Sequence, residues 1–212
     1  PDLKPETIHD LTLSGSYKWL QFMISYQREK DAILYITEQY EKNPAITTVT
    51  HRNFNRIDNF SAFLTASPAV GSWHPQLTVG VQKQWAKIEH NGETLQMDTP
   101  LFFCTLNNGI QLPYHWTLST DINFQSKGDY QNIYMYQNVF MMNATLTKSF
   151  LNEHLSIHLQ GIDLTHGRKD GNRIYNKHMN MDVANVSDSR ELRFTIRYKF
   201  NTAKSKYKGK GA

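Results

Sequence analysis

Apolar and polar residues alternate strictly along much of this chain. In residues 116–125, Trp, Leu, Thr, Ile and Phe occupy every second position, and Thr, Ser, Asp, Asn and Gln fill the positions between them. The same alternation recurs in residues 11–18 and again in 20–27. Because successive side chains of a β-strand point to opposite faces, this pattern predicts strands with one apolar and one wet face.

Extended along the chain, the pattern predicts nine long strands and no helix. We expect these strands near residues 7–18, 20–40, 47–67, 76–89, 94–112, 116–126, 132–149, 154–164 and 191–200. Several of them are much longer than the roughly 5 to 6 residues typical of globular sheets. The predicted fold class is therefore all-β, an antiparallel meander of about nine long strands that forms part of a transmembrane outer-membrane β-barrel rather than a sandwich.

The expected connections between strands fall into two kinds. Compact connections at 18–19, 68–75, 113–115 and 150–153 lie beside aromatic residues, whereas those at 41–46, 90–93, 127–131 and 165–190 are polar and rich in Asn, Asp, Gly and Lys, the last being the longest. Short periplasmic turns, longer extracellular loops and aromatic girdles are typical of bacterial outer-membrane barrels. The predicted membrane-interface aromatics are Trp19, Trp85, Trp116, Tyr198 and Phe200, and a carbohydrate-stacking platform is the alternative reading of such side chains.

The last predicted strand separates its two faces most clearly. Leu192, Phe194, Ile196, Tyr198 and Phe200 share one face, and Arg193, Thr195, Arg197 and Lys199 share the other. We expect the cationic row of Arg193, Arg197 and Lys199 to face a wet lumen. An amphipathic strand of a soluble sheet is the alternative that the alternation alone leaves open.

Composition agrees with this picture and excludes several function classes. Hydrophobic residues make up only 39% of the 212 residues, and no apolar run approaches the roughly 20 residues of a membrane helix. The mean hydropathy of −0.58 fits both a soluble protein and a barrel, whose strands average out as polar. The net charge of +4 is spread out except in the basic tail, 204–210, so we expect no nucleic-acid partner. A single cysteine, Cys104, excludes an internal disulfide.

Both ends of the chain resemble a known family. Pro1-Asp2-Leu3-Lys4-Pro5-Glu6 resembles the Asn-Pro-x-Leu-Lys-Pro-Glu segment that precedes a strand in TonB-dependent outer-membrane transporters, without the first Asn. The strand 192–200, ending in an aromatic residue, resembles the closing strand that the barrel-assembly machinery reads in that family. Residues 148–151 and 161–164 are similar to segments of the subgroup with large barrels.

The resemblance implies the C-terminal part of a barrel of roughly 22 strands in the outer membrane of a Gram-negative cell. Residues 1–200 would be the barrel part and 201–212 a basic tail. The implied partners are outer-membrane lipid, the barrel-assembly machinery through 192–200, and TonB through a plug domain that this chain does not contain. No export signal is visible at its start, as expected for an excised piece. With nine strands, the last strand would close against a first strand outside the chain, and the transported ligand is not readable.

No residue pattern indicates catalysis, a cofactor or a metal. His154 and His158 fall on one strand face, but no accompanying ligand spacing supports a metal site. Asp121 and Asp163 lie near strand ends, and we expect them in lumen or loop networks rather than in acid/base chemistry. The chain is therefore not expected to be an enzyme.

Three functions remain to be compared. The first is the barrel wall of a TonB-dependent-receptor-like protein that takes up a nutrient. The second is a soluble β-sandwich that presents aromatic residues to glycans or a protein partner. The third, ranked last, is an outer-membrane enzyme or adhesin on a small barrel.

Overall fold

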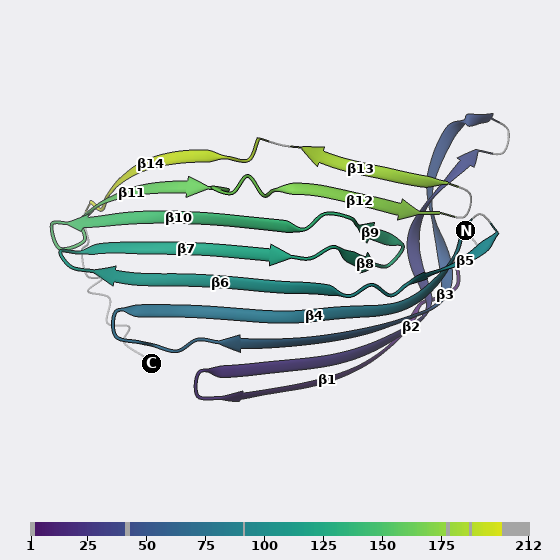
Figure 1. Ribbon diagram of the computed structural model, residues 1–212, viewed down its shortest axis with the longest axis horizontal. Coiled ribbons are helices and arrows are strands. Elements are labelled where there is room, and N and C mark those ends of the chain that lie inside the picture. The colour runs from purple at the N-terminus through teal and green to yellow at the C-terminus, as the bar shows by residue number, and fades with distance from the viewer. Residues whose placement is uncertain (1–2, 41–42, 91, 177–178, 187, 201–212) are drawn as a thin grey trace, which may run out of the picture.

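The structure, a computed structural model, describes residues 3–40, 43–90, 92–176, 179–186 and 188–200. The basic tail expected at 201–212 lies outside these residues. Long antiparallel strands dominate the described part of the chain (Figure 1). None of the described residues forms a helix long and apolar enough to cross a membrane.

The main sheet confirms the meander that the alternation predicted. Within the described residues its path is β1-β2-β3-β4-β6-β7-β10-β11-β14, and β5 pairs with β4 beside that path. The strands on the path are β1 Thr7–Tyr17, β2 Leu20–Tyr40, β3 Asn43–Ala66, β4 Trp73–His90, β6 Leu101–Leu112, β7 Trp116–Gln125, β10 Val139–Phe150, β11 Leu155–Ile162 and β14 Glu191–Tyr198. All neighbours on the path are antiparallel, and β1 and β14 are its two ends among the described residues.

A second sheet of four strands corrects one prediction. Its order is β13-β12-β9-β8, with β8 Gly128–Tyr130, β9 Ile133–Met135, β12 Lys169–Tyr175 and β13 Asn180–Val186. The sequence predicted a polar connection over 165–190, which is wrong because β12 and β13 lie within it. These strands carry polar residues on both faces, so they lack the apolar alternation that marks the long strands.

Two predicted strands are each divided in the structure. The predicted strand 94–112 breaks at residues 98–100 into β5, Glu93–Met97, and β6. Pro100 has no N–H for a ladder, and the Thr99 N–H instead bonds Asp129 Oδ2 at 2.8 Å. The predicted strand 132–149 breaks at 136–138 into β9 and β10. Both breaks lie where the main sheet gives way to the second sheet.

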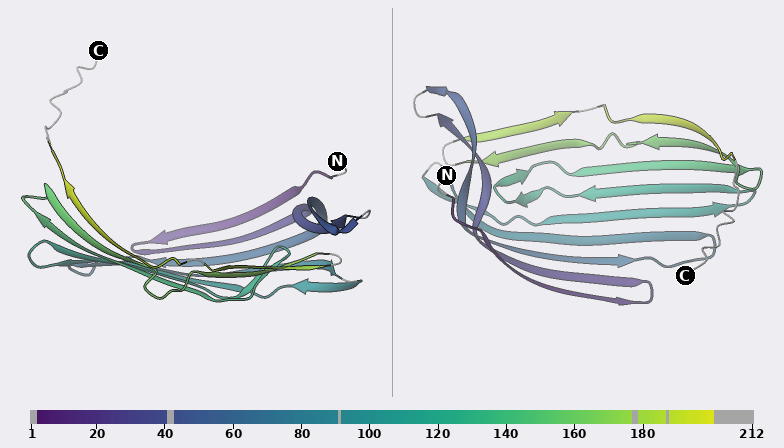
Figure 2. Two further views of the ribbon diagram at one scale, coloured as in Figure 1. Left: turned by 90° about the horizontal axis from the view of Figure 1, so that it is seen from above. Right: turned by 180° about the vertical axis from the view of Figure 1, so that it is seen from behind.

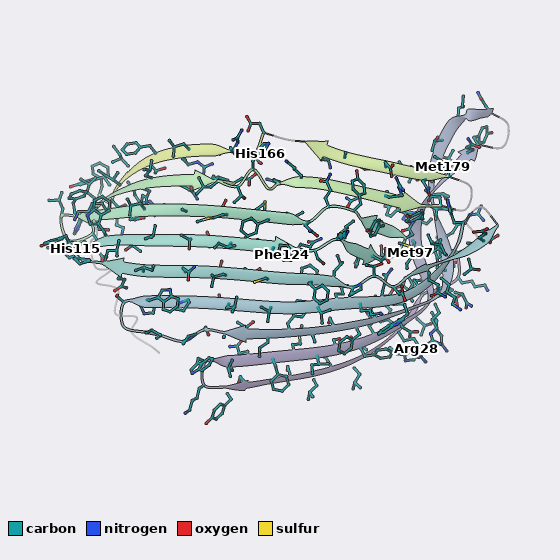
Figure 3. All side chains as sticks on the ribbon, viewed as in Figure 1. Arg28, Met97, His115, Phe124, His166 and Met179 are labelled. Carbon is teal, nitrogen blue, oxygen red and sulfur yellow. The ribbon has the colours of Figure 1, made fainter. Side chains whose placement is uncertain are left out.

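The main sheet has two different ends, which we call the turn end and the loop end. Figure 2 shows it curved like a section of a cylinder wall, with the tip of the β2–β3 hairpin curling over at the loop end. At the turn end, tight turns use left-handed backbone at Lys18, Tyr114, His115 and the run 151–153. His115 lies at the turn end, and Met97 and Met179 lie at the loop end (Figure 3).

The buried apolar core lies at the loop end and not along the wall. It is formed by Ala32 and Leu34 of β2, Ile57 of β3, Ala86 and Ile88 of β4, and Met97 of β5. Two aromatic side chains pack against it, Tyr134 of β9 and Tyr175 of β12. Asp31, with φ 52°, marks where β2 turns toward this core. The rest of the main sheet therefore has no core of its own among the described residues, and its apolar side chains need another apolar environment.

Candidate functional site

The strand register gathers the apolar side chains of the wall on one face, here called the apolar face. Cross-strand partners point to the same face of a sheet, so Leu77, Leu106, Ile122 and Met142 form one continuous row across four strands. Many side chains of this face are exposed, including Leu13 at 61% and Phe194 at 62%. A soluble monomer rarely exposes so large a contiguous apolar surface, which marks this face as an interface with lipid or protein.

The opposite face, here called the polar face, is lined by amide, hydroxyl and carboxylate groups. Gln76, Asn107, Asp121 and Asn143 are successive cross-strand partners and form a row across the wall. In the neighbouring row, Thr105 Oγ1 donates to Asn123 Oδ1 at 3.2 Å. A hollow on this face near β8 has a volume of about 180 Å³. Donors and acceptors arranged in such rows suit the passage or binding of a polar solute.

The cationic side chains predicted on the last strand divide between two environments. Arg193 and Arg197 lie opposite Gln160 and Ser156 of β11, on the polar face. Arg193 donates two hydrogen bonds to Glu191, at 2.9 and 3.1 Å. The positive charge of Arg193 is therefore compensated by this carboxylate. Lys199 follows the end of β14, and its backbone N–H bonds His154 O at 2.8 Å. That these residues face a lumen stays a prediction.

Most of the aromatic residues predicted at a membrane interface lie at the turn end. Trp19 is in the β1–β2 turn, and Trp116 begins β7 with Lys148 Nζ 5.2 Å from its ring. The rings of Tyr198 and Phe200 meet edge to face at 4.6 Å. Lysine heads beside aromatic rings at strand ends are typical of a membrane boundary.

Trp85 lies at the other boundary of the apolar face. It shares β4 and its face with Trp73, twelve positions earlier (85 minus 73), and is 45% exposed. A rise of about 3.3 Å per residue and a tilt of about 40° separate two such rings by about 30 Å across a bilayer. That separation is close to the height of the apolar band of an outer-membrane barrel, about 25 Å between its aromatic girdles.

Buried amide side chains join the loop-end segments to one another. Gln84 of β4, 2% exposed, receives the Gln131 N–H at 2.6 Å and donates to Gln131 O at 2.8 Å. Asn132 donates to Tyr35 O at 3.0 Å and Tyr175 O at 3.1 Å, and Asn176 Oδ1 accepts from the Thr37 N–H at 2.7 Å. We call Gln84, Asn132 and Asn176 the amide clasp. It fixes the β2–β3 hairpin and the second sheet over one end of the wall.

A buried carboxylate organises the connection between β11 and β12. Asp163 is 2% exposed and accepts hydrogen bonds from Gly167 N at 2.7 Å, Arg168 N at 3.3 Å and the Ser189 hydroxyl. Burial alone would raise the pKa of Asp163, but these hydrogen bonds outweigh it and hold the pKa below its ordinary value. The residue is a structural anion, in agreement with the loop network expected from the sequence.

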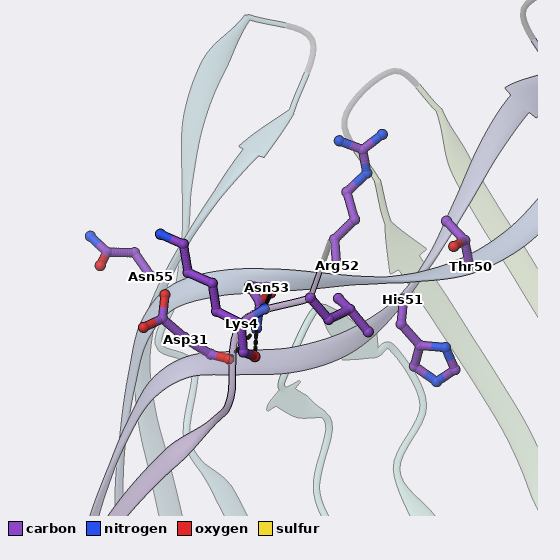
Figure 4. Close-up of a pocket in the computed structure, with 8 residues that line it drawn as sticks. Lys4, Asp31, Thr50, His51, Arg52, Asn53 and Asn55 are labelled. Atoms are coloured by element: carbon purple, nitrogen blue, oxygen red, sulfur yellow. Dashed lines mark hydrogen bonds between the residues drawn. The ribbon is translucent and has the colours of Figure 1, made fainter. Parts of the chain in front are cut away.

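A hollow lies where residues 3–6 meet the β2–β3 hairpin (Figure 4). It has a volume of about 750 Å³ and is bordered by Lys4, Asp31, His51 and Arg52. Asn53 holds the neighbouring segment by accepting from Lys4 N at 2.7 Å and donating to Lys4 O at 2.9 Å. Side chains of both charges therefore border this hollow at the loop end.

The remaining candidates from the sequence have structural partners. His158 bonds the hydroxyls of Thr147 and Ser156, each at 2.9 Å, and His154 Nδ1 lies 2.8 Å from Leu151 O. Asp121 lies in the polar row. Across the part of the chain that the structure describes, no group of three or more His, Cys, Asp or Glu side chains is placed to hold a metal.

The comparisons with known proteins point to one family. The sequence model of the outer membrane protein beta-barrel family matches residues 1–198. No curated protein matches the chain. The crystal structure of the outer membrane transporter YddB from Escherichia coli is similar over 94% of this chain and 33% of its own, with a TM-score of 0.56 and 12% identity. At that identity the likeness concerns the fold alone, and the chain spans about a third of that protein's length.

Proposed function

The chain belongs to the outer membrane protein beta-barrel family, and from this premise we propose that it forms the wall of a TonB-dependent-receptor-like transporter for a nutrient. A protein of this family lies in the outer membrane of a Gram-negative cell. The apolar face then meets lipid, and the polar face lines the interior. The soluble-sandwich hypothesis is wrong, because the long strands form a single sheet whose apolar face is exposed.

The observation that carries the proposal is the polar row of Gln76, Asn107, Asp121 and Asn143. It supplies hydrogen-bond partners across four strands with only one charged member. Such a lining lowers the cost of moving a polar solute without trapping it as a dense cluster of charges would. The cations Arg193 and Arg197 and the mixed charges of the large hollow add a field toward the two ends of the wall.

Several partners follow from the same proposal. Outer-membrane lipid covers the apolar face. The barrel-assembly machinery reads the strand 192–200, and TonB acts through a plug domain outside this chain. We propose no catalytic role, since the buried carboxylate Asp163 is committed to its turn.

The test is uptake by cells that express or lack the full-length protein. Radiolabelled solutes of several classes, namely iron chelates, cobalamin, oligosaccharides and peptides, are offered at limiting concentration, with and without a proton uncoupler. We expect at least one class to enter faster with the protein present, and the gain to disappear with the uncoupler. Equal uptake in both strains would contradict transport, and a gain that the uncoupler leaves intact would contradict energy coupling through TonB.

Asn107→Arg serves as the matched variant, because it places a charge in the polar row. We expect it to reduce uptake of the identified solute by about tenfold, which corresponds to an increase of about 1.4 kcal/mol in the barrier for passage. Leu106→Phe, the adjacent position on the apolar face, is the control and should leave uptake unchanged.

A further inference from the structure

Toward the loop end, the apolar face gives way to aromatic and basic side chains. The register places Tyr26, Phe60 and Lys83 in one row and Arg28, Asp58 and Trp85 in the next. Lys30 and Arg56 are partners in the row after that. Cross-strand partners share a face, so these side chains lie on the lipid side of the wall, directly beyond its apolar band.

Asp58 holds the arginines of this region in place. Its Oδ1 accepts from Arg28 Nε at 2.8 Å and from the Tyr26 hydroxyl at 2.8 Å, and its Oδ2 accepts from Arg56 Nε at 2.6 Å. The side chain of Asp58 is 11% exposed, against 38% for Arg28 and 50% for Arg56. The carboxylate is therefore shielded, and the two guanidinium groups stand in front of it.

The charges of this region leave an excess of positive groups. The region holds five basic side chains, namely Arg28, Lys30, Arg56, Lys83 and Lys87. Its acidic side chains are Asp58 and Asp98, with Glu89 farther along β4. Lys83 Nζ lies 5.4 Å from the centre of the Trp85 ring. A hollow of about 370 Å³ is lined by Arg56, Asp58, Trp85 and Lys87 among others. We call Arg28, Arg56, Lys83, Trp85 and Lys87 the outer cluster.

We propose that the outer cluster binds the phosphorylated headgroup of a lipid in the outer leaflet of the membrane. Short turns face the periplasm in such barrels, so the loop end lies at the outer leaflet. The acyl chains of a bound lipid would cover exposed side chains such as Ile24 and Leu64, below the cluster. Two fixed guanidinium groups suit phosphate oxygens, lysines add charge, and the Trp85 ring offers a face for a sugar.

The test uses the full-length protein, folded in outer membranes and purified in a mild, uncharged detergent. Binding is titrated with lipid A, a phosphorylated glycolipid of Gram-negative outer leaflets, with the same lipid after removal of its phosphates, and with inorganic phosphate. We expect binding of lipid A that depends on its phosphates and weakens with salt. The double variant Lys83→Gln/Lys87→Gln leaves the bonds of Asp58 intact and should weaken this binding about thirtyfold, the loss expected for two lysines near an anionic surface.

The control is Lys18→Gln, which removes one lysine charge at the turn end and should change the affinity less than twofold. Circular dichroism of each variant reports that the barrel is folded. Equal binding of lipid A with and without phosphates would overturn the proposal, as would an unchanged affinity in the folded double variant. Equal affinity for inorganic phosphate would also overturn it, because the site would then recognise a free anion.

Discussion

At the scale of single residues, the buried carboxylate of Asp163 makes stability depend on pH. Its pKa is lowered in the folded chain, whereas an unfolded Asp titrates near about 3.9. The stabilisation is therefore present above about pH 3.9 and is lost as the pH falls through the lower, folded pKa. Asp163→Asn places an amide N–H₂ group, itself a donor, beside the donors Gly167 N and Arg168 N. We expect it to destabilise the protein at pH 7 by about 1 to 3 kcal/mol.

The measurement is thermal unfolding of the full-length protein in detergent, followed by circular dichroism between pH 7 and pH 2.5. The difference between the wild type and Asp163→Asn should shrink below about pH 4. Asp188→Asn, an exposed neighbour, should behave like the wild type throughout. A difference that stays constant with pH would contradict the assignment to the Asp163 charge.

Gly167 in the same connection tolerates no side chain. A Cβ at this position would lie 1.6 Å from Phe140 O, a backbone atom that cannot move without shifting β10. Gly167→Ala should therefore cost more than about 3 kcal/mol or prevent assembly. In Gly109→Ala the nearest neighbour is 3.9 Å away, so this control should stay within about 1 kcal/mol of the wild type. The yield of folded protein and the unfolding temperature in detergent measure both variants.

At the scale of elements, the amide clasp determines whether the second sheet stays on the wall. Gln84→Leu keeps the volume of the side chain but leaves the N–H and C=O of Gln131 without this partner. We expect a loss of about 2 to 4 kcal/mol in the local opening of β8 and β9, since each unsatisfied buried group costs about 1 to 3 kcal/mol. Hydrogen exchange of the amides in 128–135 should accelerate at least tenfold, whereas exchange in β7 should not change.

Alternation along the sequence predicted the wall because each of its strands has one apolar face and one polar face. It did not predict the second sheet, because Lys169–Tyr175 and Asn180–Val186 carry polar residues on both faces and so lack the apolar alternation. Their pairing depends instead on contacts such as the Arg173–Asp182 ion pair, with Nε and Oδ1 2.6 Å apart. The break of the predicted strand 94–112 had a local signal in Pro100, which removes a ladder donor.

The amide clasp could not have been found from sequence. Thr37 and Asn176 are 139 positions apart, and a single Asn in a polar segment has no periodicity. Only the folding of the β2–β3 hairpin toward the second sheet brings them together. The shared face of Arg193 and Arg197 could be predicted from the sequence, because one strand carries the whole pattern.

At the scale of the whole molecule, Cys104 gives a direct probe of the solvent that each face of the wall meets. Cys104 lies on the apolar face, between the partners Val79 and Phe124, and the next residue, Thr105, lies on the polar face beside Thr78 and Asn123. In a background whose only cysteine is the tested one, Cys104 should resist a charged maleimide in intact membranes and react with an apolar one. Cys104→Ala/Thr105→Cys should show the reverse preference, because its thiol meets the wet interior.

The rates of labelling after detergent denaturation serve as the control, since both thiols should then react equally with either reagent. An assembled protein in which the charged reagent labels Cys104 faster than a cysteine at position 105 would contradict the membrane orientation of the wall. Adjacent residues on one strand share their depth in the membrane to within about 3.3 Å. A reversal between them therefore reports the face alone. It tests the lipid contact on which both the proposed transport path and the proposed lipid site depend.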